Sequence, residues 1–245
     1  MASLSFFHIV SVHRKASEFA VMNVRKHHPD NFYYLCVDAT EDFSYLAEEF
    51  DARYRYYTTR LGAPTWPYGL RRDGILEFLS RFRDACKACN STHMMMMEDD
   101  VLLVKPVTVE DSWGCAGADV KIGNIVPEQV HDLIEKYSGK RPTFKQYGAS
   151  GGSIFKVLPF LENYDKIVDF FSKHSDEIQT YYQRLGYADC FMQIAMWVCG
   201  EDYVANPYYI DTHNHAPNFD YESFLANLPE EKQIVNNYKK YYFHD

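Results

Sequence analysis

The chain has 245 residues, 47% of them hydrophobic and 24% charged, which is an ordinary globular composition with enough length to bury a substantial core. Its formal net charge is −9 and it contains no dense cluster of Lys and Arg, which argues against a nucleic-acid-binding protein. It has neither an apolar run of roughly 18 residues nor a basic leader, so the sequence predicts a cytoplasmic protein without a membrane span or signal peptide.

Strand and helix patterns alternate through the first hundred residues. Short apolar runs rich in β-forming residues predict strands, and apolar residues at helical spacing predict helices between them. The predicted strands cover 6–12, 32–37, 53–57 and 93–97, and the predicted helices cover 17–27, 43–50 and 75–88. This order indicates βαβ units and a mainly parallel sheet, whose strand-end loops gather along the edge where open α/β sheets bind ligands.

The region of the third predicted helix carries a basic stretch and a cysteine pair. The basic residues from Arg71 to Lys87 are interrupted by acids at helical spacing, which predicts a solvated helix face. Cys86 and Cys89 form a C-x-x-C pair, but no second pair follows at zinc-ribbon spacing. Small buried residues are therefore favoured over a structural zinc, and the cysteine pattern suits a reducing compartment.

The second half of the chain is less regular. Strands are predicted at 120–125, 152–157 and 208–213, and helices at 128–137, 160–172, 176–185 and 190–198. No internal repeat, low-complexity tract or linker separates the two halves. We therefore expect a single α/β domain over 1–245, with a nucleotide-binding half at about 1–104 and a smaller mixed half at about 105–245.

The most informative motif is three consecutive acids, Glu98-Asp99-Asp100, which directly follow the apolar strand Met94–Met97. Adjacent carboxylates repel one another, and a bound cation relieves that repulsion. Hard divalent ions prefer oxygen ligands and share them readily with phosphate. The plain alternative is an acidic turn after a strand, but a solvated turn needs no buried strand before it.

This segment resembles the DxD-type motif of GT-A glycosyltransferases, in the E-D-D form of inverting N-acetylglucosaminyltransferases and some virus-encoded members. The resemblance implies a GT-A type sheet, with Asp100 as the ligand of Mn²⁺ or Mg²⁺ and with Glu98 and Asp99 beside the sugar nucleotide. It follows the order of elements from about residue 6 to 215, although only the acidic motif is specific. For a virus-encoded enzyme the cytoplasm would be that of the host.

The resemblance also assigns residues outside the acidic motif to the donor. They lie at strand ends, before the third helix and in the glycine-rich segment at 146–153, where the plain alternatives are surface polar groups and a tight turn. These donor-binding candidates are Ser11, His13, Arg14, Asp38, Arg72, Gly151 and Gly152.

Asp189 opens the last long predicted helix, at 190–198. It is either a helix N-cap or a general base, since a helix N-terminus keeps a carboxylate ionised and inverting members of the family place an acid there. Near the C-terminus, His213 and His215 follow Asp211 at alternate positions. The resemblance implies a third metal ligand there, with His213 preferred and His215 second.

The sequence thus predicts a hexosyl- or other glycosyltransferase. It would move a sugar from a nucleoside diphosphate sugar, with a UDP-sugar favoured, to a hydroxyl of a glycan or protein-linked glycan. A base at Asp189 implies inversion, whereas a cap there leaves retention open. The rival interpretations are a metal-dependent phosphohydrolase or nuclease using the acids and the His pair, and a catalytically silent sugar-binding module. Donor, acceptor and oligomeric state stay open.

Overall fold

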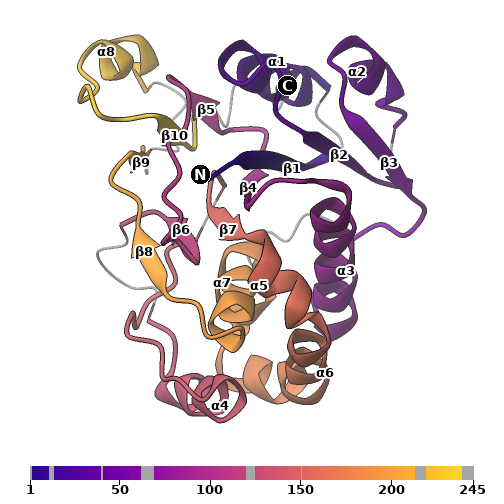
Figure 1. The fold of residues 1–245 in the computed structure, drawn as a ribbon, viewed down its shortest axis with the longest axis vertical. Helices are drawn as coiled ribbons and strands as arrows, with labels where there is room; N and C mark the ends of the chain where they lie inside the picture. Colours follow the sequence, from indigo (N-terminus) through magenta and orange to yellow (C-terminus); the bar gives the residue numbers. More distant parts are fainter. Residues whose placement is uncertain are drawn as a thin grey trace.

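The computed structural model describes residues 2–10, 14–39, 41–61, 69–119, 125–149, 151–212 and 219–238. Within these stretches the chain forms a seven-stranded sheet, a three-stranded sheet and helices that pack around them (Figure 1). The order of elements through the first hundred residues is the alternation that the sequence predicts. None of the described helices has the length and apolarity needed to cross a membrane.

The larger sheet has the strand order β3-β2-β1-β4-β7-β6-β8. Strands β1 to β4 are mutually parallel, β7 is antiparallel to its neighbours β4 and β6, and β8 is parallel to β6. The strands are β1 Leu4–Val10, β2 Tyr33–Asp38, β3 Arg53–Tyr57, β4 His93–Met97, β6 Cys115–Gly117, β7 Ile154–Lys156 and β8 Tyr203–Ala205. The sheet is mainly parallel, as expected for this fold class.

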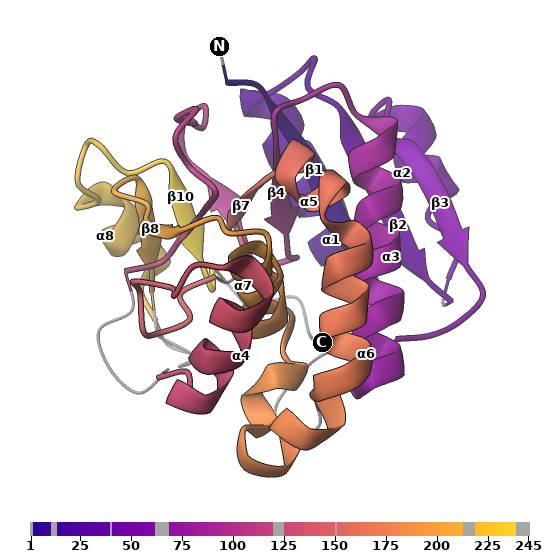
Figure 2. The same cartoon turned by 60° about the horizontal axis from the view of Figure 1, so that its bottom comes forward.

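Helices cover both faces of the sheet. Figure 1 shows α1 and α2 on one side of β1 to β4 and α3, α5, α6 and α7 on the other, and Figure 2 shows α6 lying alongside α3. The helices are α1 Arg14–His27, α2 Ser44–Glu49, α3 Arg72–Ala88, α4 Glu128–Ser138, α5 Val157–Glu162, α6 Tyr164–Tyr181, the short 3-10 helix η1 Gln183–Gly186, α7 Ala188–Val198 and α8 Tyr221–Ala226.

The core consists of two apolar layers separated by the sheet, and β4 contributes to both. Successive strand side chains point to opposite faces. Met94 and Met96 therefore pack with α3, α6 and α7, whereas Met95 and Met97 pack with α1 and α2. All four methionines are buried, which explains why this strand reads as a continuous apolar run rather than an alternating one.

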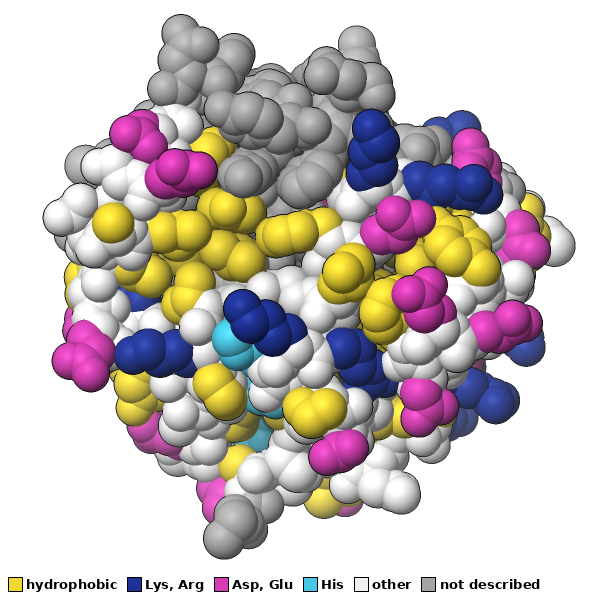
Figure 3. Space-filling model, turned by 90° about the horizontal axis from the view of Figure 1, so that it is seen from above, with side chains coloured by type: hydrophobic (Ala, Val, Ile, Leu, Met, Phe, Trp, Pro, Cys, Tyr) yellow, Lys and Arg dark blue, Asp and Glu magenta, His cyan; other side chains and the backbone are white. Residues whose placement is uncertain are grey.

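A second, smaller sheet lies beside the carboxyl end of β4. It has the order β5-β10-β9, built from β5 Leu102–Leu103, β9 Tyr209–Asp211 and β10 Ile234–Asn236. Apolar side chains of this sheet, of α8 and of α1 form a third, less completely buried cluster. In Figure 3, hydrophobic side chains gather accordingly on the side of this face where α8 lies.

Two predicted helix boundaries are wrong. The helices expected at 160–172 and 176–185 are instead α5, the single long helix α6 and η1. The break falls at Asn163, whose side-chain amide donates to the Pro159 carbonyl (2.9 Å) and so ends α5. In the last long helix, Asp189 is not the N-cap: α7 begins at Ala188, and the residue before it, Tyr187, makes no side-chain cap.

Candidate functional site

The acidic triplet occupies the turn after β4, at the carboxyl edge of the parallel strands. Strand β1 lies between β2 and β4. The strand order switches direction there, because β2 and β3 follow on one side of β1 and β4 lies on the other. Ligands of open α/β sheets bind at such a switch point. The Asp100 side chain is buried in this turn, and its backbone carbonyl accepts a hydrogen bond from the Tyr238 amide (2.8 Å). The fold therefore places the triplet where a nucleotide would be expected.

Asp99 is oriented from inside the molecule. Its Oδ1 accepts hydrogen bonds from His8 Nε2 (2.9 Å) on β1 and from Ser17 Oγ (3.1 Å) on α1. The other ring nitrogen of His8 contacts the hydroxyl of Tyr33 (2.7 Å) on β2. His8, Ser17 and Tyr33 are buried, while the Asp99 side chain keeps 23% of its surface exposed. Sequence interpretation missed these three residues, since each one reads alone as part of an apolar strand or helix face.

Glu98 lies against the glycine-rich segment. A Cβ at position 151 would lie 2.7 Å from Glu98 Oε2 and 3.0 Å from Asn236 Oδ1, so only glycine fits there without displacing them. Gly152 has a φ of +87°, and its amide donates to the Met96 carbonyl (2.7 Å). Both glycines thus allow the segment to approach the end of β4 closely, and their predicted role at the donor stays a prediction.

The ends of β9 and β10 complete this side of the site. Asn236 Nδ2 donates to Asp211 Oδ2 (3.3 Å), and Asn237 Nδ2 donates to Asp211 Oδ1 (2.7 Å). The Asn236 side chain is only 4% exposed, and its Oδ1 has no hydrogen-bond partner within the described part of the chain. Asn236 and Asn237 were not predicted. The available signal was a polar pair directly after the apolar Ile234-Val235.

Asp38 ends β2 but faces a different partner. Its Oδ1 accepts a hydrogen bond from Arg81 Nη1 (2.8 Å) on α3 and another from the Leu61 amide (2.7 Å). Both members of this ion pair are buried. The prediction of a solvated basic helix face is therefore wrong for Arg81, whose guanidinium also donates to the Thr59 carbonyl and lies 4.3 Å from the centroid of the Tyr57 ring. Through these hydrogen bonds to Thr59 and Leu61, the pair holds the residues that directly follow β3.

Arg14 and Arg72 lie at the beginnings of α1 and α3 and make surface ion pairs. Arg14 contacts Glu41 (3.3 Å), and Arg72 contacts Asp176 on α6 (2.9 Å) as well as its neighbour Asp73. Their proposed roles at the nucleotide stay predictions. Four other candidates lie outside the described residues, namely Ser11, His13, His213 and His215.

Asp189 lies in the first turn of α7, where the helix dipole favours a carboxylate. It is half-buried, and its charge contributes to raising the pKa of Tyr147 to about 12, although burial is the larger cause. One turn further along α7, Gln193 fixes the glycine-rich segment. Its Oε1 accepts from the amides of Gly148 (2.7 Å) and Ala149 (3.1 Å). The segment thus contacts α7 at Gly148 and Ala149 and the acidic triplet at Gly151.

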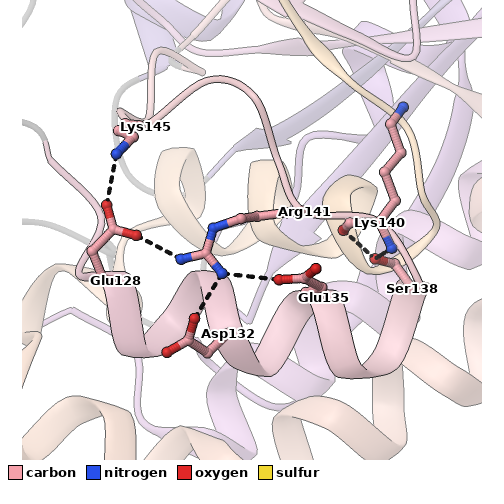
Figure 4. Close-up of polar contacts among 7 residues, drawn as sticks. All are labelled: Glu128, Asp132, Glu135, Ser138, Lys140, Arg141 and Lys145. Atoms are coloured by element: carbon pink, nitrogen blue, oxygen red, sulfur yellow. Dashed lines mark hydrogen bonds and ion pairs between the residues drawn. The ribbon is translucent and has the colours of Figure 1, made fainter.

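A network of charged side chains holds the chain before the glycine-rich segment onto α4 (Figure 4). Arg141 contacts Glu128 (2.6 Å), Asp132 (2.7 Å) and Glu135 (2.9 Å), and Lys145 contacts Glu128 (2.9 Å). Hydrogen bonds from Lys145 and Arg141 lower the pKa of Glu128 to about 2. The network fixes residues 141–145 and thereby the start of the segment that reaches Glu98.

The donor set at the triplet suits a hard divalent cation, because it consists of carboxylate oxygens beside an unsatisfied buried amide oxygen, Asn236 Oδ1. Among the described residues, however, no group of three or more His, Cys, Asp or Glu side chains converges closely enough to hold a metal ion. The described acids would therefore need further ligands, such as phosphate oxygens, water or a residue outside the described ranges.

No family model matches this sequence, and no curated protein matches it significantly. Solved structures do match. The galactosyltransferase LgtC, solved with donor and acceptor sugar analogues, has a TM-score of 0.51 and 13% identity, covering 96% of this chain and 87% of its own. The bifunctional glycosyltransferase WbbM, in its apo form, has a TM-score of 0.51 and 10% identity, covering 96% of this chain and 45% of its own.

This chain has the GT-A fold. The fold class predicted from the E-D-D motif and the strand order is thereby confirmed. At these identities the likeness is one of fold, so the activity of this GT-A chain has to be argued from its site.

Proposed function

We propose that this GT-A chain transfers a sugar from a nucleoside diphosphate sugar to a hydroxyl group of a glycan acceptor, with the help of a divalent cation. The observation that carries the proposal is the placement of Glu98, Asp99 and Asp100 at the switch point of the sheet, with a glycine-rich segment packed directly on Glu98. Similarity to a galactosyltransferase solved with donor and acceptor sugar analogues supports the same reaction class. A UDP-sugar is the favoured donor.

The acids have different roles in this proposal. Asp100 binds Mn²⁺ or Mg²⁺ together with His213, or with His215 in its place. When bound, such an ion neutralises charge that develops on the departing diphosphate, which is worth several kcal/mol of barrier. Asp99 and Glu98 accept hydrogen bonds from hydroxyl groups of the ribose and the donor sugar. Gly151 and Gly152 let the backbone approach the sugar closely.

Asp189 is proposed as the general base. It lies in the first turn of α7, whose Gln193 contacts the glycine-rich segment at Gly148 and Ala149, whereas Glu98 contacts that segment at Gly151. This difference supports a role at the acceptor rather than at the diphosphate. As an acceptor hydroxyl attacks the anomeric carbon, the bond from that carbon to the diphosphate breaks, and the hydroxyl proton passes to the Asp189 carboxylate. Attack from the face opposite the leaving group gives inversion.

The main alternative, a two-metal phosphohydrolase or nuclease, needs additional carboxylates on neighbouring strand ends for a second ion about 4 Å from the first. Asp38 would be the nearest source on β2, but it forms a buried ion pair with Arg81. That pairing weakens the alternative. Hydrolysis of phosphodiester substrates without sugar transfer would support it instead.

The proposal is tested by a panel of nucleoside diphosphates and their sugars, each with Mn²⁺ and with EDTA. We expect at least one nucleoside diphosphate to raise the melting temperature much more with Mn²⁺, because phosphate oxygens complete the metal's shell. The matching sugar nucleotide should then serve as donor to glycan acceptors, detected as released nucleoside diphosphate and as glycosylated product. Equal melting shifts with and without EDTA, and no transfer from any donor, would refute the proposal.

A further inference from the structure

The orientation of Asp99 depends on two buried donors that act on the same oxygen. His8 Nε2 and Ser17 Oγ both contact Oδ1, at 2.9 and 3.1 Å. No residue of the described ranges makes a hydrogen bond to Oδ2, and 23% of the surface of the Asp99 side chain is exposed. Within the described part of the chain, one oxygen of this carboxylate is thus held by the protein and the other has no hydrogen-bond partner.

The contact with Asp99 fixes one hydrogen-bond role of His8. A carboxylate accepts only, so His8 Nε2 carries a hydrogen and donates to Asp99. The other ring nitrogen, Nδ1, contacts the buried Tyr33 hydroxyl across 2.7 Å, and a phenol can donate or accept there. Burial raises the pKa of Tyr33 well above its usual value, so the phenol keeps its hydrogen. Tyr33 therefore helps to hold the His8 ring in the orientation that donates to Asp99.

We propose that His8, with its ring oriented by Tyr33, is a positioning residue that turns Asp99 so that Oδ2 faces the hydroxyl groups of the bound nucleotide sugar. The inference rests on the proposed function and assigns a positioning role to buried residues of β1 and β2. Two buried donors on Oδ1 restrict rotation of the carboxylate, so less freedom is lost when a ligand binds. His8, Ser17 and Tyr33 thus hold Asp99 in its binding orientation before the ligand arrives.

The first test compares three single variants by titrating the sugar nucleotide identified in the panel, in the presence of Mn²⁺. His8→Phe keeps an aromatic ring but removes the donor, and should weaken sugar-nucleotide affinity at least about tenfold, as expected for a hydrogen bond to a charged group. His8→Gln can place an amide N–H near the Nε2 position and should restore most of that loss. Tyr33→Phe, which removes one hydroxyl, should weaken affinity by a smaller factor.

A double-variant cycle separates positioning from general damage to the fold. If His8 acts through Asp99, His8→Phe should have little further effect on affinity in the background of Asp99→Asn. Additive losses in the cycle, or parental affinity of folded His8→Phe and Tyr33→Phe, would overturn the inference. If His8→Phe fails to fold, Tyr33→Phe and His8→Gln still decide the question. A parent protein that binds no sugar nucleotide would instead refute the proposed function itself.

Discussion

Two acids lie at the carboxyl ends of parallel strands on either side of β1, Asp38 as the last residue of β2 and Asp99 just after β4. Asp38 is buried and its charge is balanced by the buried guanidinium of Arg81. Asp99 is held by the side chains of His8 and Ser17, and it keeps part of its surface exposed. A buried guanidinium neutralises the charge of the Asp38 carboxylate within the fold. Two hydrogen-bond donors on one oxygen of Asp99 orient that carboxylate without neutralising it. The different partners lead us to expect a structural role for Asp38, whose predicted place at the donor stays a prediction, and a binding role for Asp99.

The largest expected effect comes from breaking the structural pair. Asp38→Ala removes one of the two carboxylates that pair with the buried Arg81 guanidinium and leaves only Glu77 (2.9 Å), so it should cost about 3 kcal/mol of unfolding free energy. Chemical denaturation measures this loss. The double variant Asp38→Ala with Arg81→Met removes both charges and should recover much of the stability. If Asp38→Ala has the stability of the parent but binds nucleotide more weakly, Asp38 acts in ligand binding rather than in stabilising the fold.

A third acid extends the comparison to catalysis. Asp189→Asn keeps the size of the side chain but cannot take a proton at neutral pH, so transfer should slow by a factor of about 10² to 10⁴ under saturating donor. Melting temperature and Mn²⁺-dependent donor binding should stay close to those of the parent. Since Asp189 lies within the first turn of α7 and is not its N-cap, only a modest change in the helix dipole interaction is expected.

An Asp189→Asn enzyme that transfers sugar at the parental rate would show that this carboxylate has no catalytic role. The stereochemistry of the product would then need to be examined for retention.

The next variant asks whether the glycine-rich segment sets the position of Glu98. Gly151→Ala places a Cβ within 2.7 Å of Glu98 Oε2, so the carboxylate or the segment must move. We expect a loss of about 1–3 kcal/mol from overpacking and weaker sugar-nucleotide affinity. Gly74→Ala is the matched control: the three atoms nearest to its Cβ would all belong to the flexible Leu70 side chain, the first at 3.1 Å, and alanine favours the helix. Equal affinities of both variants would contradict the close-approach role.

The smallest effect is expected at the surface network on α4. Arg141→Gln should lower the melting temperature slightly at low salt, and the difference should shrink at high salt because exposed ion pairs are screened. The pKa of Glu128 is lowered by the network to about 2 from its usual 4.5. The stabilisation is therefore present above about pH 4.5 and is lost as the pH falls toward 2. A melting difference that persists unchanged at pH 2 and in high salt would argue against an electrostatic role.

The sequence predicted those parts of the structure whose signal is local. Strands β3 and β4 have the predicted bounds, and the E-D-D motif identified the GT-A fold, because a buried parallel strand and a triple acid are visible in a short window. Strands β5 and β10 were missed because each has only two or three residues and forms by pairing Leu102–Leu103 with Ile234–Val235, far apart in the chain.

The same reason limited the prediction of the site. Arg81 and Asp38 are 43 residues apart, and His8 and Asp99 are 91 apart, so neither pairing has a local pattern. Arg81 was read as solvated because its helix carries acids at regular spacing, yet its guanidinium enters the core to reach Asp38. Asn236 became a candidate only when the fold brought the end of β10 to Gly151 and Glu98.

The measurement that tests the account most directly is a calorimetric titration of the nucleoside diphosphate into the parent protein and into Asp100→Asn, each with Mn²⁺ and with EDTA. Lys173→Ala, at an exposed ion pair on α6, is the matched control. The account predicts saturable binding with Mn²⁺ for the parent and for Lys173→Ala, and loss of that binding in EDTA or in Asp100→Asn. Equal binding by the parent in EDTA, or undiminished binding by Asp100→Asn, would contradict it.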